Sequence, residues 1–409
     1  MTRSAVNSTL IQMQPFLILS LPFIAFILLT QLAFNTIVDE HLFHLKTIEA
    51  FAASFPFFDL KDYPVSSGPL PYILWTIFGK IFGFEIWKLR ALTAFISYLG
   101  SLMFFGTCRE HKIPSPFLKT FILFFSPYVF LHSFTLYTIN WTLLWEIFSF
   151  RYFMRYVESE SKVDLTWSSI GSLALVFSRQ IDVALPMGTL CYLLVENRLR
   201  KPLALLGSLL PILGLLLLFI YWNGITPLRS QTGYPLSFKL TQFTLLLVII
   251  GFYFQPVGLF EGWRLRGWSV FFFILWIPYL LIFRIPYPEE GLGIVYYGID
   301  FVGRRFYTGL SWMLPLYLGI VGGLVFYSLG RKIHESARPP LASYVLIFYM
   351  LLNCFNPFVY ERYYYFAWPM ILLLLPSDVS RNRLLSILVL AIHIVISIFY
   401  VKLSLVFPK

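Results

Sequence analysis

The stretch PLPYILWTIFGKIFGFEIW, residues 69–87, decides how the chain is arranged in a membrane. It is apolar enough to be considered as a span, but two prolines stand at its start and Gly79, Lys80 and Glu85 interrupt it. If it crossed the bilayer, all the short loops rich in Lys and Arg that follow it in the chain would lie on the opposite side of the membrane. We therefore predict that this stretch is a helix lying on the outer membrane interface.

The composition of the whole chain is that of a membrane protein. Of its 409 residues, 58% are hydrophobic and only 12% are charged, which lies outside the usual range of soluble domains. Apolar runs of roughly 20 residues, the length that crosses a bilayer, recur along the sequence. We predict an all-α integral membrane protein with one polytopic domain, residues 1–409, in which residues 37–90 form the first outer loop.

The positive charge of the chain lies in short loops between the apolar runs. The formal net charge of +11 could suggest nucleic acid, but the distribution follows the rule that short cytoplasmic loops are rich in Lys and Arg. We therefore expect no nucleic-acid partner. The basic loops are residues 108–112, 151–162, 197–201, 263–267, 330–340 and 380–383.

With residues 69–87 outside the bilayer, all these loops fall on one side, and about thirteen spans result with the N-terminus inside. The first span is read as a retained signal anchor. The expected spans, which make a helical bundle, are residues 14–36, 91–107, 115–133, 136–155, 166–178, 183–196, 202–222, 240–260, 268–285, 309–330, 341–358, 363–377 and 384–404.

The cysteines and the loop lengths bear on cofactors and location. Three cysteines lie far apart and suggest neither a disulfide framework nor a thiolate metal site. We expect no cofactor. The short loops favour a prokaryotic cytoplasmic membrane, and in a eukaryote the location would be the membrane of the endoplasmic reticulum.

Ionisable residues gather on the outer side. The segment NTIVDEHLFH, residues 35–44, follows the first span and opens a long polar loop, a feature that is usually functional. More than half of the 20 acidic residues fall on this side. The basic residues that depart from the positive-inside pattern are Lys46, Lys61, Arg179, Arg229, Arg284, Arg304, Arg305 and Arg362. They need either these acids or an anionic ligand as partners.

This arrangement suits a defined chemistry. A carboxylate at the membrane boundary and near arginines can act as general base on a hydroxyl, while arginine binds a departing phosphate through its planar fork of donors. His41 and His44 stand three residues apart and could instead place two imidazoles on a metal together with Asp39.

Four stretches resemble a known family. VDEHLFH (38–44) is similar to an Asp-Glu-x-Phe-His motif, and DYPVSSGPLPY (62–72) follows an Asp-Pro-x-Ile-Thr-Thr-Pro-Pro-Gly-x-Tyr pattern. SRQIDVA (178–184) resembles Phe-Arg-Gln-Thr-Asn, and ERYYYFAW (361–368) resembles Asn-Arg-His-Tyr-x-Phe. The motifs and their order resemble the GT-C glycosyltransferases that use polyprenyl-phosphate-linked sugars, and most closely the dolichyl-phosphate-glucose-dependent α-1,2-glucosyltransferases.

The resemblance implies roles for individual residues. Asp39 would be the catalytic base, and Glu40 its helper that orients the acceptor or the loop. The implied substrate-binding residues are Asp62, His44, Arg179, Gln180, Arg362 and Tyr364. Arg179 and Arg362 would hold the donor phosphate, and no metal would be needed.

For several of these residues a purely structural role remains open as an alternative. Asp62 could begin the turn before Pro64, Arg179 could pair with Asp182, and Arg362 could be a snorkelling arginine in an aromatic belt. Asp39 and Glu40 could be a helix cap or a hydrated pair at the membrane boundary.

The resemblance also implies the reaction and its partners. A sugar, expected to be a hexose such as glucose, would pass from a polyprenyl or dolichyl phosphate to an acceptor hydroxyl on the outer or lumenal side, with inversion at the anomeric carbon. The acceptor would be a glycan or a lipid-linked molecule, and membrane lipids would surround the protein. The alternative function is a multi-span transporter or lipid flippase, which predicts internal repeats and broken helices.

Overall fold

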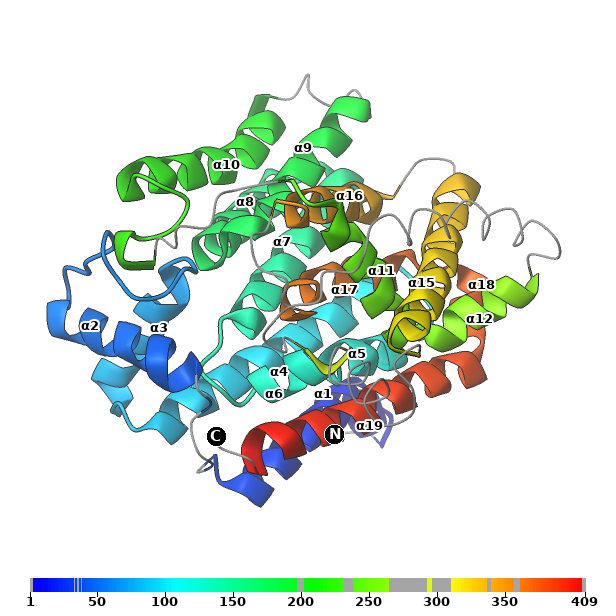
Figure 1. Cartoon of the computed structure of the whole chain (residues 1–409), viewed down its shortest axis with the longest axis horizontal. Helices are drawn as coiled ribbons and strands as arrows, with labels where there is room; N and C mark the ends of the chain where they lie inside the picture. Colours follow the sequence, from blue (N-terminus) through cyan, green and yellow to red (C-terminus); the bar gives the residue numbers. More distant parts are fainter. Residues whose placement is uncertain are drawn as a thin grey trace.

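The computed structural model describes residues 3–32, 34, 37, 39–196, 202–230, 238–264, 293–295, 310–336, 340–355 and 361–406. Within these ranges the chain is helical and contains no strand. Figure 1 shows a bundle in which α1 and α19 run along one edge and α10 along the opposite edge. The prediction of an all-α protein is confirmed for this part of the chain.

The helices and helical turns of the described residues follow in chain order. They are α1 (Arg3–Thr30), η1 (Glu40–Leu45), α2 (Lys46–Ser54), α3 (Leu70–Phe82), α4 (Ile86–Glu110), α5 (Pro116–Phe124), α6 (Pro127–His132), α7 (Ile139–Ser159), α8 (Lys162–Ser178), η2 (Gln180–Val183), α9 (Ala184–Val195), α10 (Pro202–Trp222), η4 (Leu228–Ser230), α11 (Leu240–Tyr253), α12 (Gln255–Arg264), α15 (Leu310–Glu335), α16 (Leu341–Asn353), η5 (Glu361–Tyr363), η6 (Tyr365–Ala367), α17 (Trp368–Leu374), α18 (Ser377–Arg381) and α19 (Arg383–Val406).

The bundle is built from neighbouring helix pairs. In one part of it α4 packs on α7, α7 on α8, and α8 on α10, while in another α11 packs on α15. The α11–α15 crossing is close because Gly251 faces Leu318 and Gly322 faces Leu247. A Cβ added at Gly251 would lie 1.8 Å from the Leu318 carbonyl oxygen. Small residues of this kind let membrane helices approach each other.

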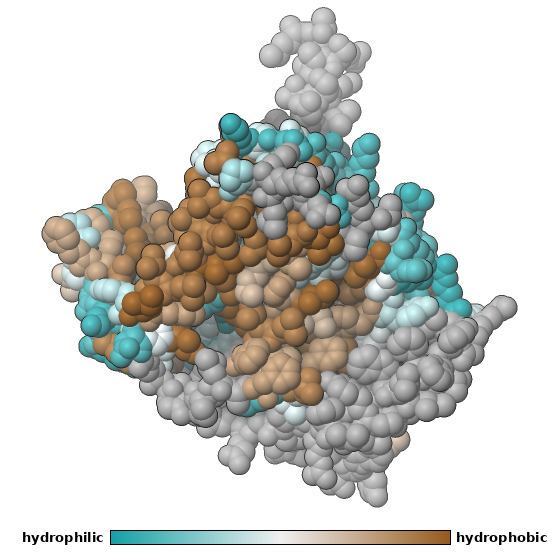
Figure 2. Space-filling model, turned by 90° about the horizontal axis from the view of Figure 1, so that it is seen from above, coloured by the Kyte–Doolittle hydropathy of each residue, from teal (hydrophilic) through white to brown (hydrophobic). Residues whose placement is uncertain are grey.

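Several helices can cross a bilayer. Four helices in the described ranges are long and apolar enough, and a fifth results if the bent pair α11–α12 is one span. Figure 2 shows a broad hydrophobic area on one face with hydrophilic residues at its borders. On α10, Leu206, Leu217 and Ile220 are 56%, 66% and 75% exposed, as lipid-facing side chains would be. The chain is therefore an integral membrane protein, while the number of about thirteen spans stays a prediction.

Two of the expected spans each consist of two helices. Residues 115–133 form α5 and α6, which are separated at Phe125 and Ser126 before Pro127. Residues 240–260 form α11 and α12, whose axes bend by 91° at Phe254, just before Pro256 in the first turn of α12. Proline lacks the amide hydrogen and its ring collides with the preceding turn, so each helix restarts at its proline.

The span expected at residues 363–377 is also interrupted. The chain there makes the two short turns η5 and η6 before the seven-residue helix α17. These turns place Arg362 and Tyr363 on irregular backbone, which membrane proteins tolerate where it is buried in protein or lines a cavity. The expected span 268–285 and residues Arg284, Arg304 and Arg305 lie outside the described residues.

The stretch 69–87 forms the short helix α3. Its 13 residues extend about 20 Å, less than the roughly 30 Å of a bilayer core. Tyr72 and Trp75 are buried against the rest of the protein, whereas Ile81 and Phe82 are 68% and 57% exposed. This length and two-sidedness agree with a helix that does not cross the bilayer, and its place on the outer interface stays a prediction.

Candidate functional site

The segment after α1 folds into η1, a turn of π-helix that separates two adjacent carboxylates. Asp39 stands immediately before η1 with its side chain 31% exposed. Glu40, the first residue of η1, is completely buried. Single π-turns are rare in proteins, and those that do occur are often found at functional sites. Two neighbouring acids therefore meet different environments.

Glu40 is saturated by hydrogen bonds. Arg90 of α4 donates from Nε to Oε1 at 3.0 Å and from Nη2 to Oε2 at 2.6 Å. The backbone N–H groups of Leu136 and Ile37 add bonds at 2.9 and 3.3 Å. A fully buried carboxylate with four donors has no place for a substrate. Of the two roles expected for Glu40, orienting the loop fits this geometry and contact with the acceptor does not.

Arg90 extends this anchor to the end of the first helix. Its Nη1 donates to the carbonyl oxygens of Leu32 and Phe34 at 2.9 and 2.8 Å. The guanidinium also lies 3.9 Å from the centre of the Phe34 ring. The Glu40–Arg90 pair thereby fixes the start of residues 37–90 relative to α1, α4 and the segment that leads into α7.

Asp39 faces the C-terminal part of the protein. Its Oδ2 accepts a hydrogen bond from Nη1 of Arg362 at 2.7 Å, and the Tyr137 hydroxyl also bonds to this carboxylate. Burial acts to raise the pKa of Asp39, but Arg362 and the hydrogen bond from Tyr137 outweigh it, so this pKa lies below its usual value. Asp39 is therefore an ionised, half-buried carboxylate at neutral pH.

Arg179 lies next to Arg362, on irregular backbone after α8. Its guanidinium carbon is 4.5 Å from the centre of the Tyr363 ring and 4.6 Å from that of Phe366. Within the described ranges no carboxylate comes within 4 Å of its nitrogens. The Arg362 guanidinium lies 5.7 Å from the same Tyr363 ring, and the two positive charges repel each other. Two arginines thus flank one tyrosine, and only Arg362 has an ion pair there.

His44 forms a wall of the site. Its Nδ1 lies 2.7 Å from the Tyr72 hydroxyl, which in turn lies 3.0 Å from Oγ of Ser67. Its ring is 4.6 Å from the Tyr137 ring. Burial, together with Arg362 and Arg179 and against the effect of Asp39, lowers the pKa of His44 to about 3. The imidazole is therefore neutral under ordinary conditions.

The metal alternative does not fit this geometry. His44 is buried, whereas His41 is exposed, so the two imidazoles point to different surroundings. No group of three potential metal-ligating side chains occurs in the portion of the chain that can be searched.

Gln180 joins the segment around Ser66 to the turn after α8. Its Nε2 donates to the Ser66 carbonyl oxygen at 2.7 Å, and the Gly68 N–H donates to the Ser178 carbonyl oxygen at 3.1 Å. A Cβ at Gly68 would lie 2.1 Å from the carbonyl oxygen of Phe177, so only glycine allows this approach. Gln180 is thus a docking residue for the loop.

Asp62 and Tyr364 have partners away from Asp39. Asp62 forms an ion pair at 3.2 Å with Arg229, and both side chains are exposed. Tyr364 is only 2% exposed, and its hydroxyl bonds to Gln242 of α11. We therefore leave both residues out of the proposed site. The alternative pairing of Arg179 with Asp182 is not a close ion pair, because Asp182 instead accepts a bond from Tyr349 at 3.0 Å.

Four sequence motifs meet at this place. The first and the fourth meet through Asp39 and Arg362, the third and the fourth through Arg179 and Tyr363, and the second and the third through Ser66 and Gln180. Asp39 and Arg362 are 323 residues apart in the chain. Of the predicted residues, the structure gathers Asp39, His44, Arg179 and Arg362.

Sequence reasoning missed Tyr137. Its ring stacks on His132 with a centroid distance of 3.8 Å, faces His44, and lies 5.7 Å below the Arg362 guanidinium. The surrounding LYTIN, residues 136–140, is a plain apolar stretch whose tyrosine gives no signal of its own. Arg90 was likewise missed, because a basic residue at the start of an apolar run is ordinary.

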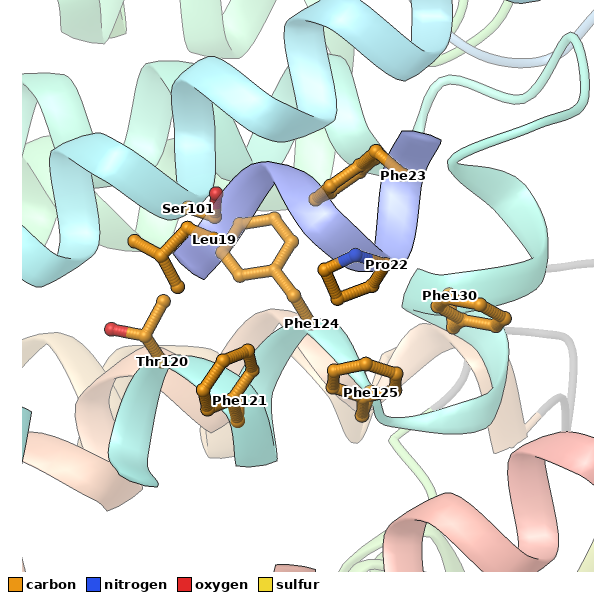
Figure 3. Close-up of a pocket in the computed structure, with 9 residues that line it drawn as sticks. All are labelled: Leu19, Pro22, Phe23, Ser101, Thr120, Phe121, Phe124, Phe125 and Phe130. Carbon is orange, nitrogen blue, oxygen red and sulfur yellow. The ribbon is translucent and has the colours of Figure 1, made fainter. Parts of the chain in front are cut away.

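A separate apolar pocket lies between α1, α4, α5 and α6 (Figure 3). Its lining residues are Leu19, Pro22, Phe23, Ser101, Thr120, Phe121, Phe124, Phe125 and Phe130. It contains no ionisable side chain and no residue of the site around Asp39. We assign no chemistry to it.

Comparisons with known proteins add little. No protein-family model matches the chain, and no curated protein matches it either. Among solved structures it is similar to ArnT from Cupriavidus metallidurans, once bound to undecaprenyl phosphate and once in the apo state. The TM-scores are 0.44 and 0.42, with 11% sequence identity over 87% of this chain and 76% of that chain in both cases. The function must therefore be argued from the site.

Proposed function

We propose that this protein is a membrane glycosyltransferase that moves a sugar from a polyprenyl-phosphate donor to an acceptor hydroxyl. The observation that carries the proposal is the convergence of one ionised carboxylate, Asp39, with the two arginines Arg179 and Arg362. The order of the four motifs, which resembles that of the GT-C glycosyltransferases, supports it as well.

The proposed reaction is one displacement at the anomeric carbon. Asp39 takes the proton of the acceptor hydroxyl while that oxygen forms a bond to the anomeric carbon. The bond between this carbon and the phosphate oxygen breaks, and its electron pair leaves with the polyprenyl phosphate. Arg179 and Arg362 neutralise the charge that grows on the phosphate. Attack opposite to the leaving group inverts the configuration, so a β-linked donor gives an α product.

The arrangement of the aromatic rings supports phosphate binding by Arg179. The Tyr363 and Phe366 rings lie 4.5 and 4.6 Å from its guanidinium carbon, and such ring contacts use none of its hydrogen-bond donors. A planar fork of donors matches two phosphate oxygens. These ring contacts support a role for Arg179 as a phosphate-binding residue.

The sugar and the acceptor come from the resemblance, the membrane side from the distribution of the basic loops, and the prokaryotic location from the short loops. We propose a hexose, with glucose tested first, and an acceptor that enters from the outer or lumenal side of a prokaryotic cytoplasmic membrane. Because Asp39 is still 31% exposed in its ion pair, a hydroxyl can approach it without unfolding of the loop.

A transporter or lipid flippase is the second candidate. The 91° bend between α11 and α12 favours it, because broken helices often form transport sites. Against it, the charged contacts of Asp39, Arg179 and Arg362 join η1, η5 and the turn after α8, and Glu361, which meets Tyr253 at the bend, is fully buried. The experiment that tests the enzyme also separates the two functions.

The test compares the purified wild-type protein with Asp39→Asn and Glu49→Gln in nanodiscs, using radiolabelled polyprenyl-phosphate glucose or mannose and a membrane lipid extract. We expect transfer to fall by roughly 10²–10⁴ in Asp39→Asn, since the general base is removed. Donor binding should persist there. Glu49 is exposed on α2, so Glu49→Gln should transfer normally.

Two outcomes would contradict the proposal. Equal transfer by Asp39→Asn would remove Asp39 as the base. Movement of the labelled lipid between leaflets, with no transfer of its sugar to any acceptor, would favour the flippase.

A further inference from the structure

Arg362 has two functions in the proposed site that compete for its one positive charge. In this structure its Nη1 bonds to Asp39 at 2.7 Å, whereas in the proposed reaction it binds phosphate. We propose that the donor phosphate draws Arg362 away from Asp39 and thereby frees the base only when a donor is in place. This inference rests on the proposed function and adds an order of events to it.

The two arginines create the attraction that drives this exchange. Arg179 and Arg362 lie 4.5 and 5.7 Å from the centre of the same Tyr363 ring, and their charges repel each other. An anion between them removes this repulsion and binds both forks. Asp39 contacts Arg362 and not Arg179, and Asp182, the carboxylate that acts on Arg179, is engaged by Tyr349.

The exchange changes Asp39 in the direction that catalysis needs. A carboxylate that holds an arginine is a weak base, because protonation would break the ion pair. When Arg362 turns to the phosphate, Asp39 keeps its hydrogen bond from Tyr137, but the positive charge of Arg362 no longer lies beside it. Its affinity for a proton rises, and the acceptor hydroxyl can then give up its own.

The other ionisable groups around this pair do not replace Arg362. His44, on the same turn as Asp39, is held neutral by burial. His132 of α6 and Tyr400 of α19 lie within range of the Arg362 charge, and neither carries a positive charge at neutral pH. Behind Arg179, Asp182 is engaged by Tyr349. Arg362 is thus the group in the described site whose movement alters Asp39.

The chemistry of the leaving group reinforces the exchange. A polyprenyl-phosphate sugar is a phosphodiester with one negative charge, and breaking its bond to the sugar leaves a phosphate with a second one. Arg362 is therefore held most strongly by the phosphate as the bond breaks. The same movement stabilises the leaving group and strengthens the base.

The test is a pair of pH profiles measured on the wild-type protein. The profile of kcat/KM for the donor reports Asp39 in the free enzyme, and that of kcat/KM for the acceptor at saturating polyprenyl-phosphate sugar reports it in the donor complex. We expect the acid limb of the second profile to lie at higher pH by about 1 unit, since an opposite charge nearby lowers the pKa of an acid by roughly 1–3 units.

Two variants show which arginine is responsible. In Arg362→Gln the free-enzyme limb should rise to meet that of the donor complex, whereas in Arg179→Gln the donor KM should rise and the free-enzyme limb should stay in place. Arg179 is the matched control because it does not contact Asp39. A normal gel-filtration profile and a thermal melt like that of the wild type exclude misfolding of either variant.

Each outcome has a clear meaning. Transfer with coincident limbs in the wild type overturns the exchange and leaves the glycosyltransferase intact. Absence of transfer under all conditions overturns the proposed function and the exchange with it. A structure of the complex with undecaprenyl phosphate in which Arg362 still bonds to Asp39 would also overturn the exchange.

Discussion

Two carboxylates that are neighbours in the chain each pair with an arginine, and the two pairs differ in almost everything else. The Glu40–Arg90 contact of 2.6 Å joins side chains that are both 0% exposed. The Asp39–Arg362 contact of 2.7 Å joins side chains that are 31% and 24% exposed. The bond lengths are alike, so burial and the number of further partners decide what each pair does.

The difference separates an anchor from a reactive site. Removing two charges from water is costly, and a buried pair persists only when further hydrogen bonds satisfy both ions. Glu40 and Arg90 meet this condition and cannot release each other cheaply. Asp39 and Arg362 keep access to solvent, so a ligand can replace one partner.

Loss of the anchor is the largest effect that we expect. Glu40→Gln should lower the free energy of unfolding by about 3–5 kcal/mol, because the charge of Arg90 stays buried without its partner. Asp39→Asn should lower it by at most about 1 kcal/mol, since its pair is partly exposed. Unfolding of both variants and the wild type by denaturant in one common detergent, followed by circular dichroism, measures both values.

The double variant Glu40→Gln with Arg90→Met serves as the control. It should be more stable than Glu40→Gln alone, because it removes the stranded charge. If Glu40→Gln and Asp39→Asn destabilise the protein equally, the distinction between anchor and site is wrong.

Much of the fold was predictable from the sequence, and some particular elements were not. The stretch 202–222 was predicted to its ends, because a long run of leucines leaves one interpretation. The breaks at Pro127 and Pro256 were visible as residues, but membrane helices sometimes tolerate proline, and only tertiary packing decides. Irregular backbone at η5 was hidden, because its tyrosines look like an aromatic belt.

The site was predictable as a set of residues and not as contacts. Asp39, Arg179 and Arg362 were named because their motifs resemble those of a known family, and the two arginines also because basic residues on the predicted outer side depart from the positive-inside pattern. Which of two adjacent acids is buried could not be read, because Arg90 lies 50 residues from Glu40 in the chain.

Substitution of an arginine by lysine keeps the charge and changes the shape of the charged group, so it tests whether each arginine depends on its planar geometry. Arg179→Lys keeps the charge and loses the flat group that stacks on Tyr363 and Phe366. We expect the donor KM to rise about tenfold, or ~1.4 kcal/mol, with little change in stability. Arg90→Lys should show the reverse, a loss of stability, because lysine cannot make the two-pronged bond to Glu40. Binding titrations and thermal melts of both variants measure this.

Acid titration should reveal the weaker pair. Because the pKa of Asp39 is lowered in the folded state, its contribution is fully present above the unfolded pKa, near 3.8, and is lost as the pH falls through the folded pKa. The stability difference between wild type and Asp39→Asn should therefore be constant near neutrality, at most about 1 kcal/mol, and vanish in strong acid. A difference that grows toward acid would have the wrong sign for a lowered pKa.

Asp62 is the third acid in residues 37–90 that pairs with an arginine, and its substitution should give the smallest effect. Asp62 and Arg229 are 37% and 63% exposed, and their contact is the longest of the three at 3.2 Å. Asp62→Asn should change the free energy of unfolding by less than about 0.5 kcal/mol. It should also leave the acceptor KM unchanged, since Asp62 already has a surface partner. A raised acceptor KM at unchanged kcat would contradict this. It would show that Asp62 binds the acceptor although it lies away from Asp39.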